Sequence, residues 1–206
     1  MPARIERLVT SGTFSLDGGT WDVDNNVWLV GDDHEVLVID AAHDAERILH
    51  AVGDRRVVAL VCTHGHNDHI NAVGDVQAAL ECPVWLHSAD QMLWSTLYAE
   101  SPDHDLTDGT TFEVAGTVLT AIHTPGHSPG STCLYAEELE AVFTGDTLFH
   151  GGPGATGRSY SDKPTILKSI RERLLTLPTG TVVHTGHGDT TTIAAETLNL
   201  DEGERA

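Results

Sequence analysis

Basic residues are scarce in this sequence of 206 residues. Eleven lysines and arginines stand against 31 aspartates and glutamates, which gives a formal net charge of −20 at pH 7. A field of this sign repels phosphate backbones and anionic lipid. We therefore expect no nucleic-acid partner and no membrane partner.

Long apolar runs and a secretion signal are also lacking. The longest apolar segments, such as residues 57–62, are strand-sized, whereas a bilayer span needs about 20 residues. A signal peptide has an apolar stretch followed by a small-residue cleavage site. Residues 1–7 do not begin such a pattern. We expect a cytoplasmic protein.

Cysteine is rare as well. Cys62, Cys82 and Cys133 are odd in number, widely spaced and outside any Cys-x-x-Cys pair. This pattern excludes a disulfide framework and a sulfur-rich zinc knuckle. We expect the three residues to be small, buried and apolar in behaviour.

Strand-like and helix-like segments both occur along the chain. Runs rich in β-branched residues, bounded by Gly, Asp, Pro or Thr, predict strands at residues 5–9, 27–30, 36–39, 57–61, 84–87, 118–122, 141–144 and 181–184. Apolar residues at three- and four-residue spacing predict helices at 45–52, 70–80 and 164–175. The pattern indicates a mixed α/β fold, with two sheets or one large sheet covered by helices. Because no linker divides the chain, we expect one domain over residues 1–206.

The segment after the predicted strand 57–61 is rich in potential metal ligands. It reads Thr-His-Gly-His-Asn-Asp-His over residues 63–69. Alternate side chains of extended backbone project to one side, so His64, His66 and Asp68 can converge while His69 turns toward a second point. Without a cation such buried groups would be left unpaired, at about 1–3 kcal/mol each. A solvated turn explains any one histidine, but the whole cluster predicts a metal site.

Three further candidates, His127, Asp146 and His187, each follow a β-like run and stand beside or near glycine. Ligands at the carboxyl ends of several strands meet in one crevice. Five histidines and two aspartates exceed the three or four ligands of one tetrahedral zinc, so they predict two metals that share a carboxylate and a water. Nitrogen and oxygen donors fit zinc, iron or manganese. We expect two zinc ions, with iron or manganese as alternatives.

The combined motif resembles the metallo-β-lactamase superfamily over about residues 27–196. The resemblance implies an αββα four-layer sandwich of two mixed β-sheets with helices on the outer faces. It also implies the distribution of the ligands: His64, His66 and His127 on one metal, Asp68, His69 and His187 on the other, and Asp146 bridging.

Segments 145–149, 169–178 and 186–193 are similar to glyoxalase II-like hydrolases. That resemblance implies hydrolysis of a small-molecule thioester, of the hydroxyacylglutathione type, by attack of hydroxide on the carbonyl. Asp68 is the expected catalytic residue, orienting the nucleophile as well as binding metal. Arg158 and Tyr160, which follow the glycine-rich segment 151–157, are the expected substrate contacts.

Two departures leave the carrier thiol open. Tyr160 stands where such hydrolases commonly have an acidic residue, so the orientation of the metal ligands can differ. The sequence also ends 19 residues after His187, without the additional helical region that grips glutathione in glutathione-specific enzymes.

Several alternatives stay open. An iron persulfide dioxygenase of the same fold would use one iron on His64, His127 and Asp146, although Gly-His-Gly around His187 favours the hydrolases. β-Lactamase activity is less favoured because true metallo-β-lactamases replace the position of His69 or lack the bridging aspartate. A ribonuclease-type member would be expected to attract nucleic acid, and the net charge of −20 speaks against it. A lactonase and a non-catalytic metal-binding module complete the alternatives.

No motif in the sequence indicates the oligomeric state or a role for the remaining histidines. Since dimers are common among soluble enzymes, a homodimer is the default expectation. We expect the histidines outside the motif to be mostly surface or satisfied core residues: His34, His43, His50, His87, His104, His123, His150 and His184. Of these, His123 and His150 flank motif segments and are candidates for contact with substrate or with the ligands.

Overall fold

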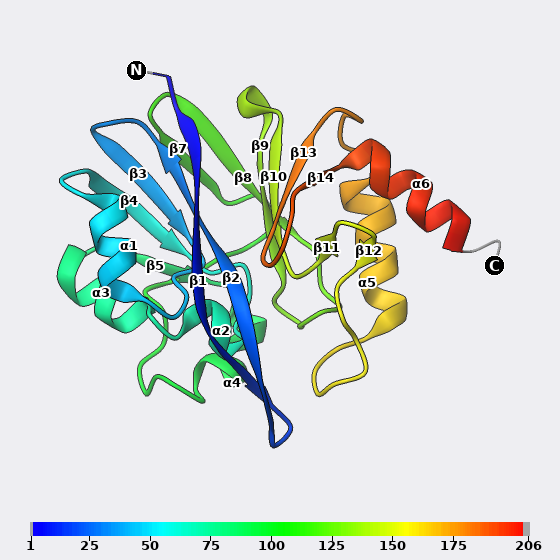
Figure 1. The fold of residues 1–206 in the computed structure, drawn as a ribbon, viewed down its shortest axis with the longest axis horizontal. Coiled ribbons are helices and arrows are strands. Elements are labelled where there is room, and N and C mark those ends of the chain that lie inside the picture. The colour runs from blue at the N-terminus through cyan, green and yellow to red at the C-terminus, as the bar shows by residue number, and fades with distance from the viewer. Residues whose placement is uncertain (1, 204–206) are drawn as a thin grey trace.

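Two six-stranded β-sheets form the centre of the computed structural model, which describes residues 2–203 (Figure 1). Met1 and residues 204–206, the ends of the expected domain, lie outside the described residues. The first sheet has the order β1 (Arg4–Leu16), β2 (Gly19–Gly31), β3 (Glu35–Ile39), β4 (Arg56–Val61), β5 (Val84–Leu86) and β6 (His104–Asp105). The second has the order β14 (Thr191–Thr192), β13 (Val182–Thr185), β10 (Ala141–Gly145), β9 (Thr132–Ala136), β8 (Thr117–His123) and β7 (Thr111–Val114).

Both sheets are mixed. In the first, β1 to β3 pair antiparallel and β3 to β6 pair parallel. In the second, only β10 and β13 are parallel. A two-stranded ribbon of β11 (Leu148–Phe149) and β12 (Gly152–Pro153) lies beside the second sheet.

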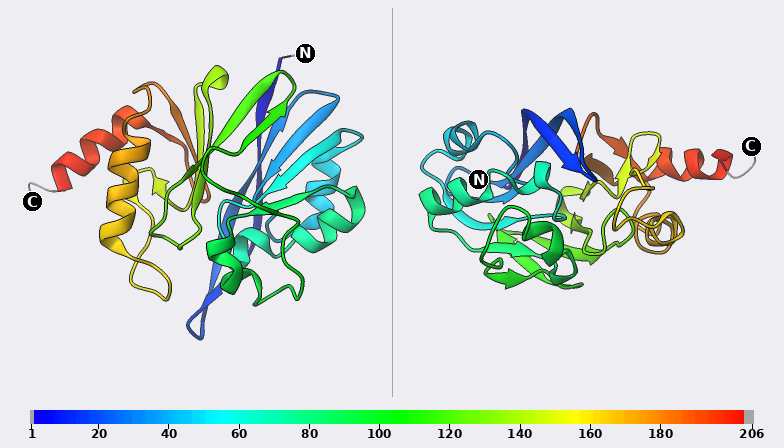
Figure 2. Two further views of the ribbon diagram at one scale, coloured as in Figure 1. Left: turned by 180° about the vertical axis from the view of Figure 1, so that it is seen from behind. Right: turned by 90° about the horizontal axis from the view of Figure 1, so that it is seen from below.

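Helices cover the outer faces. α1 (Ala45–Val52) and α3 (Val73–Leu80) lie outside the first sheet, and α5 (Lys163–Ser169), its π-helical continuation Ile170–Leu174 and α6 (Ile193–Gly203) lie outside the second (Figures 1 and 2). The short helices α2 (Asn67–Ile70) and α4 (Gln91–Trp94) follow β4 and β5. Among residues 2–203, every helix is too short or too polar to cross a membrane.

The layering follows from the side-chain alternation of the strands. On β3, Val36 and Val38 face the core under α1 and α3, whereas Leu37 and Ile39 face the core between the two sheets. A third core packs the second sheet against α5. Three apolar interfaces separate four layers, so the αββα sandwich expected from the sequence is confirmed.

Each predicted strand is observed, but some elements differ in extent. The expected helix 70–80 is two helices, α2 and α3, separated at Asn71 and Ala72. The predicted strand 5–9 is a partly exposed segment of β1, and the predicted strand 27–30 is the buried end of β2. The two strands continue as a hairpin to the turn at Asp17 and Gly18. The hairpin extends past the other strands at the bottom of Figure 1. As expected, the three cysteines are buried free thiols.

Candidate metal centre

The seven predicted ligands all follow strands and come together at one end of the sandwich. His64 and His66 lie in the loop after β4, and Asp68 and His69 in the helix α2 that this loop enters. The other three follow strands of the second sheet: His127 after β8, Asp146 after β10 and His187 after β13. Ligands from both sheets therefore meet across the interface of the sandwich.

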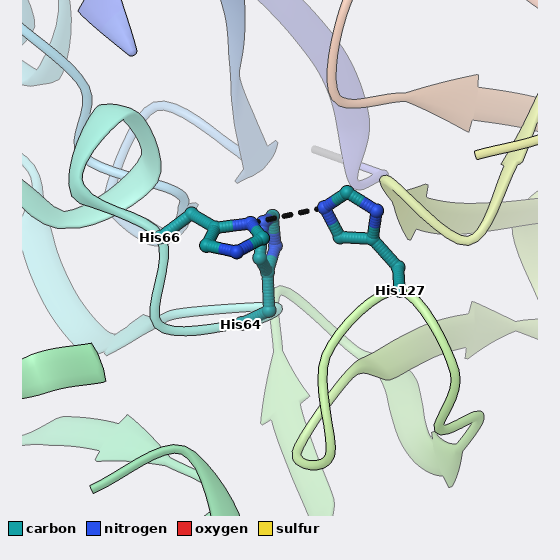
Figure 3. A group of neighbouring side chains, drawn as sticks. All are labelled: His64, His66 and His127. Carbon is teal, nitrogen blue, oxygen red and sulfur yellow. Dashed lines mark hydrogen bonds between the residues drawn. The ribbon is translucent and has the colours of Figure 1, made fainter. Parts of the chain in front are cut away.

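His64, His66 and His127 form the first group, and each offers a ring nitrogen within 4.8 Å of the others. Nδ1 of His66 lies 3.0 Å from Nε2 of His127. Figure 3 shows the three rings converging from two loops, one after β4 and one after β8. All three residues are buried.

Asp68, His69 and His187 form the second group, again with donor atoms within 4.8 Å. Oδ2 of Asp68 lies 3.3 Å from Nε2 of His187 and 3.6 Å from Nε2 of His69. Asp146 lies between the groups: its carboxylate is 3.3 Å from Nε2 of His69, 3.4 Å from Nε2 of His187 and 3.6 Å from Nε2 of His127. This is the position that a bridging carboxylate requires.

The arrangement fits a pair of divalent cations. Nε2 of His64 and one carboxylate oxygen each of Asp68 and Asp146 are buried and lack a hydrogen-bond partner. Unpaired buried polar atoms are costly and rare. The donors are nitrogens and oxygens, which suit divalent metals. The cluster of histidines and aspartates therefore supports a dinuclear metal site.

Gly186 makes the close packing around Asp146 feasible. A Cβ atom at this position would lie 2.2 Å from Oδ1 of Asp146 and 2.8 Å from Cε1 of His69. Any larger residue would displace the carboxylate from the two groups of ligands.

Burial sets the protonation of the first group. Desolvation, with the nearby His127, lowers the pKa of His66 to about 3, and burial lowers the pKa of His64 well below its usual value. Both rings are therefore neutral at pH 7, as metal ligation requires. Burial opposes ionisation of Asp146, but His187 and His69 outweigh it and hold the pKa of this carboxyl well below the usual range.

In the second group, charge dominates over burial. Burial alone would lower the pKa of His187, but Asp146 and Asp68 raise it to about 10. The pKa of His69 is also raised, against the effect of burial, by Asp146, Asp68 and Asp40. Protons on these rings balance the carboxylates until a cation replaces them, so metal binding must release protons.

Hydrogen bonds orient the rings. Nδ1 of His127 lies 2.9 Å from the carbonyl oxygen of Ala155, and Nδ1 of His187 lies 2.8 Å from that of Asp24. A carbonyl oxygen can only accept, so each Nδ1 carries the hydrogen and each Nε2 is directed at the cluster. These contacts fix the orientation in which Nε2 of each ring could bind a cation.

Asp90 joins the loops of the first group and was not anticipated from the sequence. Its buried carboxylate accepts hydrogen bonds from the backbone N–H of Gly65 (2.8 Å) and Gly130 (2.6 Å) and from Oγ of Ser128 (2.6 Å). Gly65 lies between His64 and His66, whereas Ser128 follows His127. No spacing rule links Asp90 to either loop, so only the fold reveals the contact.

A cavity of about 250 Å³ opens above the cluster. Five predicted ligands line it: His66, Asp68, His127, Asp146 and His187. Phe14, Trp21 and Val23 of the β1–β2 hairpin form an apolar wall, and Arg158 lines the rim with its guanidinium carbon 3.8 Å from the Trp21 ring centroid. The hairpin half that the sequence analysis missed therefore forms part of the site.

The other predicted contacts lie elsewhere. Tyr160 is 52% exposed and is not among the residues that line the cavity, so its contact with substrate stays a prediction without structural support. His123 stacks on His87 with 4.1 Å between ring centroids, and His150 is exposed. Neither of these two lines the cavity.

Comparison with known proteins identifies the family. The family model described as "Metallo-beta-lactamase superfamily" matches residues 20–187. This chain belongs to that superfamily. The matched residues include all seven clustered ligands.

Members of the superfamily with related sequences include two bacterial hydrolases. The chain is 33% identical to the probable metallo-hydrolase YqgX of Bacillus subtilis, over 84% of this chain and 88% of that protein. It is 31% identical to the hydroxyacylglutathione hydrolase GloC of Haemophilus influenzae, over 83% of this chain and 89% of that protein. These likenesses support a metallo-hydrolase.

Solved structures of the superfamily share the fold. The BLEG-1 B3 metallo-beta-lactamase matches with a TM-score of 0.76 and 30% identity, over 90% of this chain and 95% of that chain. TTHA1623, solved in a di-iron-bound form, matches with a TM-score of 0.75 and 32% identity, over 85% of this chain and 93% of that chain. A two-metal centre therefore occurs in a relative of similar sequence.

Proposed function

We propose that the protein is a metal-dependent hydrolase that cleaves thioesters of a small carrier thiol. The observation that carries the proposal is the position of Asp146, whose carboxylate lies within 3.6 Å of ligand nitrogens from both groups. The 31% identity to a hydroxyacylglutathione hydrolase supports the thioester as substrate. The carrier thiol itself stays open.

We propose two zinc ions as the cofactor, with iron or manganese as alternatives. His64, His66 and His127 would hold one ion, Asp68, His69 and His187 the other, and Asp146 would contact both. Such a pair supplies Lewis acidity and brings the pKa of a bound water to about 7. The absence of thiolate among the donors agrees with any of the three metals.

The residues of the chain then bind and orient the reactants. Asp68, fixed at the floor of the cavity, orients the water, while the apolar wall of Phe14, Trp21 and Val23 excludes bulk solvent from the thioester. Arg158 at the rim binds an anionic part of the substrate. Because thiolate is a good leaving group, no side chain need act as a strong acid.

Metal analysis and a substrate panel test the proposal. We expect about two zinc ions per chain and turnover of thioesters but not of lactones or β-lactams. One iron per chain with oxygen uptake on a persulfide would support a dioxygenase instead. Stoichiometric metal without turnover of any member of the panel would support a non-catalytic module.

A variant pair tests the role of Asp146. Asp146→Asn should lose a metal and most thioesterase turnover, since a neutral amide balances two cations poorly. Asp75→Asn, an exposed carboxylate on α3, is the control and should retain both. A folded Asp146→Asn protein with two metals and full turnover would contradict the proposal.

The location and oligomeric state are separate proposals. We propose a cytoplasmic protein that acts on a small molecule and forms a homodimer, as expected from the sequence. Light scattering of the metal-loaded protein measures the last of these.

A further inference from the structure

His43 is a partly buried histidine outside the ligand set, and several contacts hold it in place. Its backbone adopts φ = 62°, a conformation that residues other than glycine rarely adopt. Its backbone N–H donates to Oδ1 of Asn71 over 2.6 Å. The ring packs against Gly12 of β1, where an added Cβ would come within 2.2 Å of Nδ1.

Both ring nitrogens of His43 have amide partners. Nδ1 lies 2.9 Å from Nδ2 of Asn71, and Nε2 lies 2.8 Å from Oδ1 of Asn25. The amide nitrogen of Asn25 in turn donates to Oδ2 of Asp68 over 3.1 Å. A continuous chain of hydrogen bonds therefore joins Asn71 to a predicted metal ligand.

The direction of every hydrogen bond in this chain follows from one fixed donor. The backbone N–H of His43 can only donate, so the atom of Asn71 that faces it must be oxygen. The amide NH2 of Asn71 then faces Nδ1 of His43, which must accept. A neutral His43 ring therefore carries its hydrogen on Nε2 and donates to the oxygen of Asn25.

The same logic sets the orientation of Asn25. With its oxygen engaged by His43, its NH2 group must face Asp68. Oδ2 of Asp68 also faces Nε2 of His187 at 3.3 Å. Since one lone pair of Oδ2 is used by Asn25, the carboxylate is held at the rotation that presents it to His69 and His187.

We propose that His43 is a positioning residue that acts through Asn25 to orient Asp68 for the second metal. The inference rests on the proposed two-metal site and assigns a role to two residues outside its ligand set. Mutation of a residue that orients a metal ligand typically lowers metal affinity about 10- to 100-fold. The effect should be confined to the group of Asp68, because among the described residues the side-chain hydrogen bonds of the first group go to other partners.

The tautomer of His43 can be observed directly in the unmodified protein. Long-range 1H–15N NMR spectra of the zinc-loaded, 15N-labelled protein distinguish a hydrogen on Nε2 from one on Nδ1. We expect the Nε2–H form. The signals of His43 are assigned as those that disappear from the spectrum of His43→Gln. A neutral ring with the hydrogen on Nδ1 would overturn the proposal.

Competitive zinc titration with a chromophoric chelator measures the effect on each metal. In Asn25→Ala and His43→Leu, the dissociation constant of the second zinc should rise about 10- to 100-fold, while that of the first stays within about threefold. His43→Gln, which can still donate to Asn25, should restore most of the loss. His87→Gln, another partly buried histidine, is the matched control and should bind both metals as the wild type does.

Gly12→Ala provides a variant that removes no polar group. The added Cβ must displace the ring of His43, so the second zinc should again weaken selectively. Unchanged binding of the second zinc in all three disruptive variants, or equal weakening of both, would overturn the role of His43. Binding of a single zinc by the wild type would instead overturn the two-metal site, and the role of His43 with it.

Discussion

The carboxylate of Asp40 lies 2.9 Å from Nδ1 of His69, and both side chains are at most 2% exposed. Asp40 also accepts hydrogen bonds from the backbone N–H and the hydroxyl of Thr63. A carboxylate can only accept, so Nδ1 of His69 carries the hydrogen and Nε2 faces the cluster of candidate ligands. The end of β3 thus fixes both the loop after β4 and one ligand in α2.

Replacing this carboxylate by an amide should disturb His69 specifically. In Asp40→Asn, the NH2 group would face either Nδ1 of His69 or the N–H of Thr63, and both are donors. We expect about a 10- to 100-fold loss in affinity for the second metal and a decrease of about 1–3 kcal/mol in the free energy of unfolding. Zinc titration and urea denaturation measure these. A variant with wild-type affinity and stability would show that the hydrogen-bond direction at His69 is unimportant.

Asp90 should have a larger effect on folding. In Asp90→Ala the buried N–H groups of Gly65 and Gly130 lose their acceptor. At about 1–3 kcal/mol for each of the two unpaired groups, the free energy of unfolding should fall by about 2–6 kcal/mol. The first metal should weaken more than the second. Asp105→Ala, which removes exposed hydrogen bonds to Ser88, is the control and should cost less than about 1 kcal/mol. Equal losses in the two variants would contradict the expectation.

The convergence of the candidate ligands could be predicted from the sequence because these residues form local patterns. His64, His66, Asp68 and His69 lie within six residues, and each remaining ligand follows a strand and stands near glycine. Asp40, Asp90 and His43 have no such pattern. Their partners are 18 or more residues away along the chain, so their roles depend on the tertiary fold.

The observed bounds of some helices and strands differ from those expected from the sequence because tertiary contacts set them. Periodicity predicts one helix over 70–80, but Ala72 donates to the carbonyl of Ala41 and Asn71 binds the backbone of His43, which interrupts it. The outer half of the β1–β2 hairpin lacks the apolar run of a buried strand. Its Asp17-Gly18 turn is nevertheless a typical hairpin signal, and it is the feature from which the aromatic wall of the cavity could have been predicted.

The ring of His184 makes stability depend on pH. It packs against Trp28 and Phe143, and its buried Nδ1 has no hydrogen-bond partner. Burial, with the charge of Arg7, lowers its pKa to about 4, against about 6.5 in an unfolded chain. Between these values the unfolded chain binds a proton that the folded protein does not, so the free energy of unfolding falls as pH decreases.

The size of this effect can be isolated with His184→Leu, which does not titrate. Between pH 7 and pH 5 the wild type should lose up to about 2 kcal/mol more than the variant. Urea denaturation in the presence of a chelator measures both, so that loss of metal does not contribute. A difference between the two proteins that does not change with pH would contradict the lowered pKa of His184.

Arg158 should select substrates by charge. It is the only lysine or arginine among the described residues that line the cavity, and it stacks on Trp21 in a protein whose net charge is −20. In Arg158→Leu, KM for a thioester with a carboxylate on its carrier thiol should rise about fivefold, as expected for an exposed ion pair, with little change in kcat. KM for a neutral thioester should not change. Arg158→Lys should recover only part of the loss, because an ammonium group cannot stack on the indole as a planar guanidinium does. If KM rose equally for the neutral and the anionic thioester, Arg158 would act on the shape of the rim and not on charge.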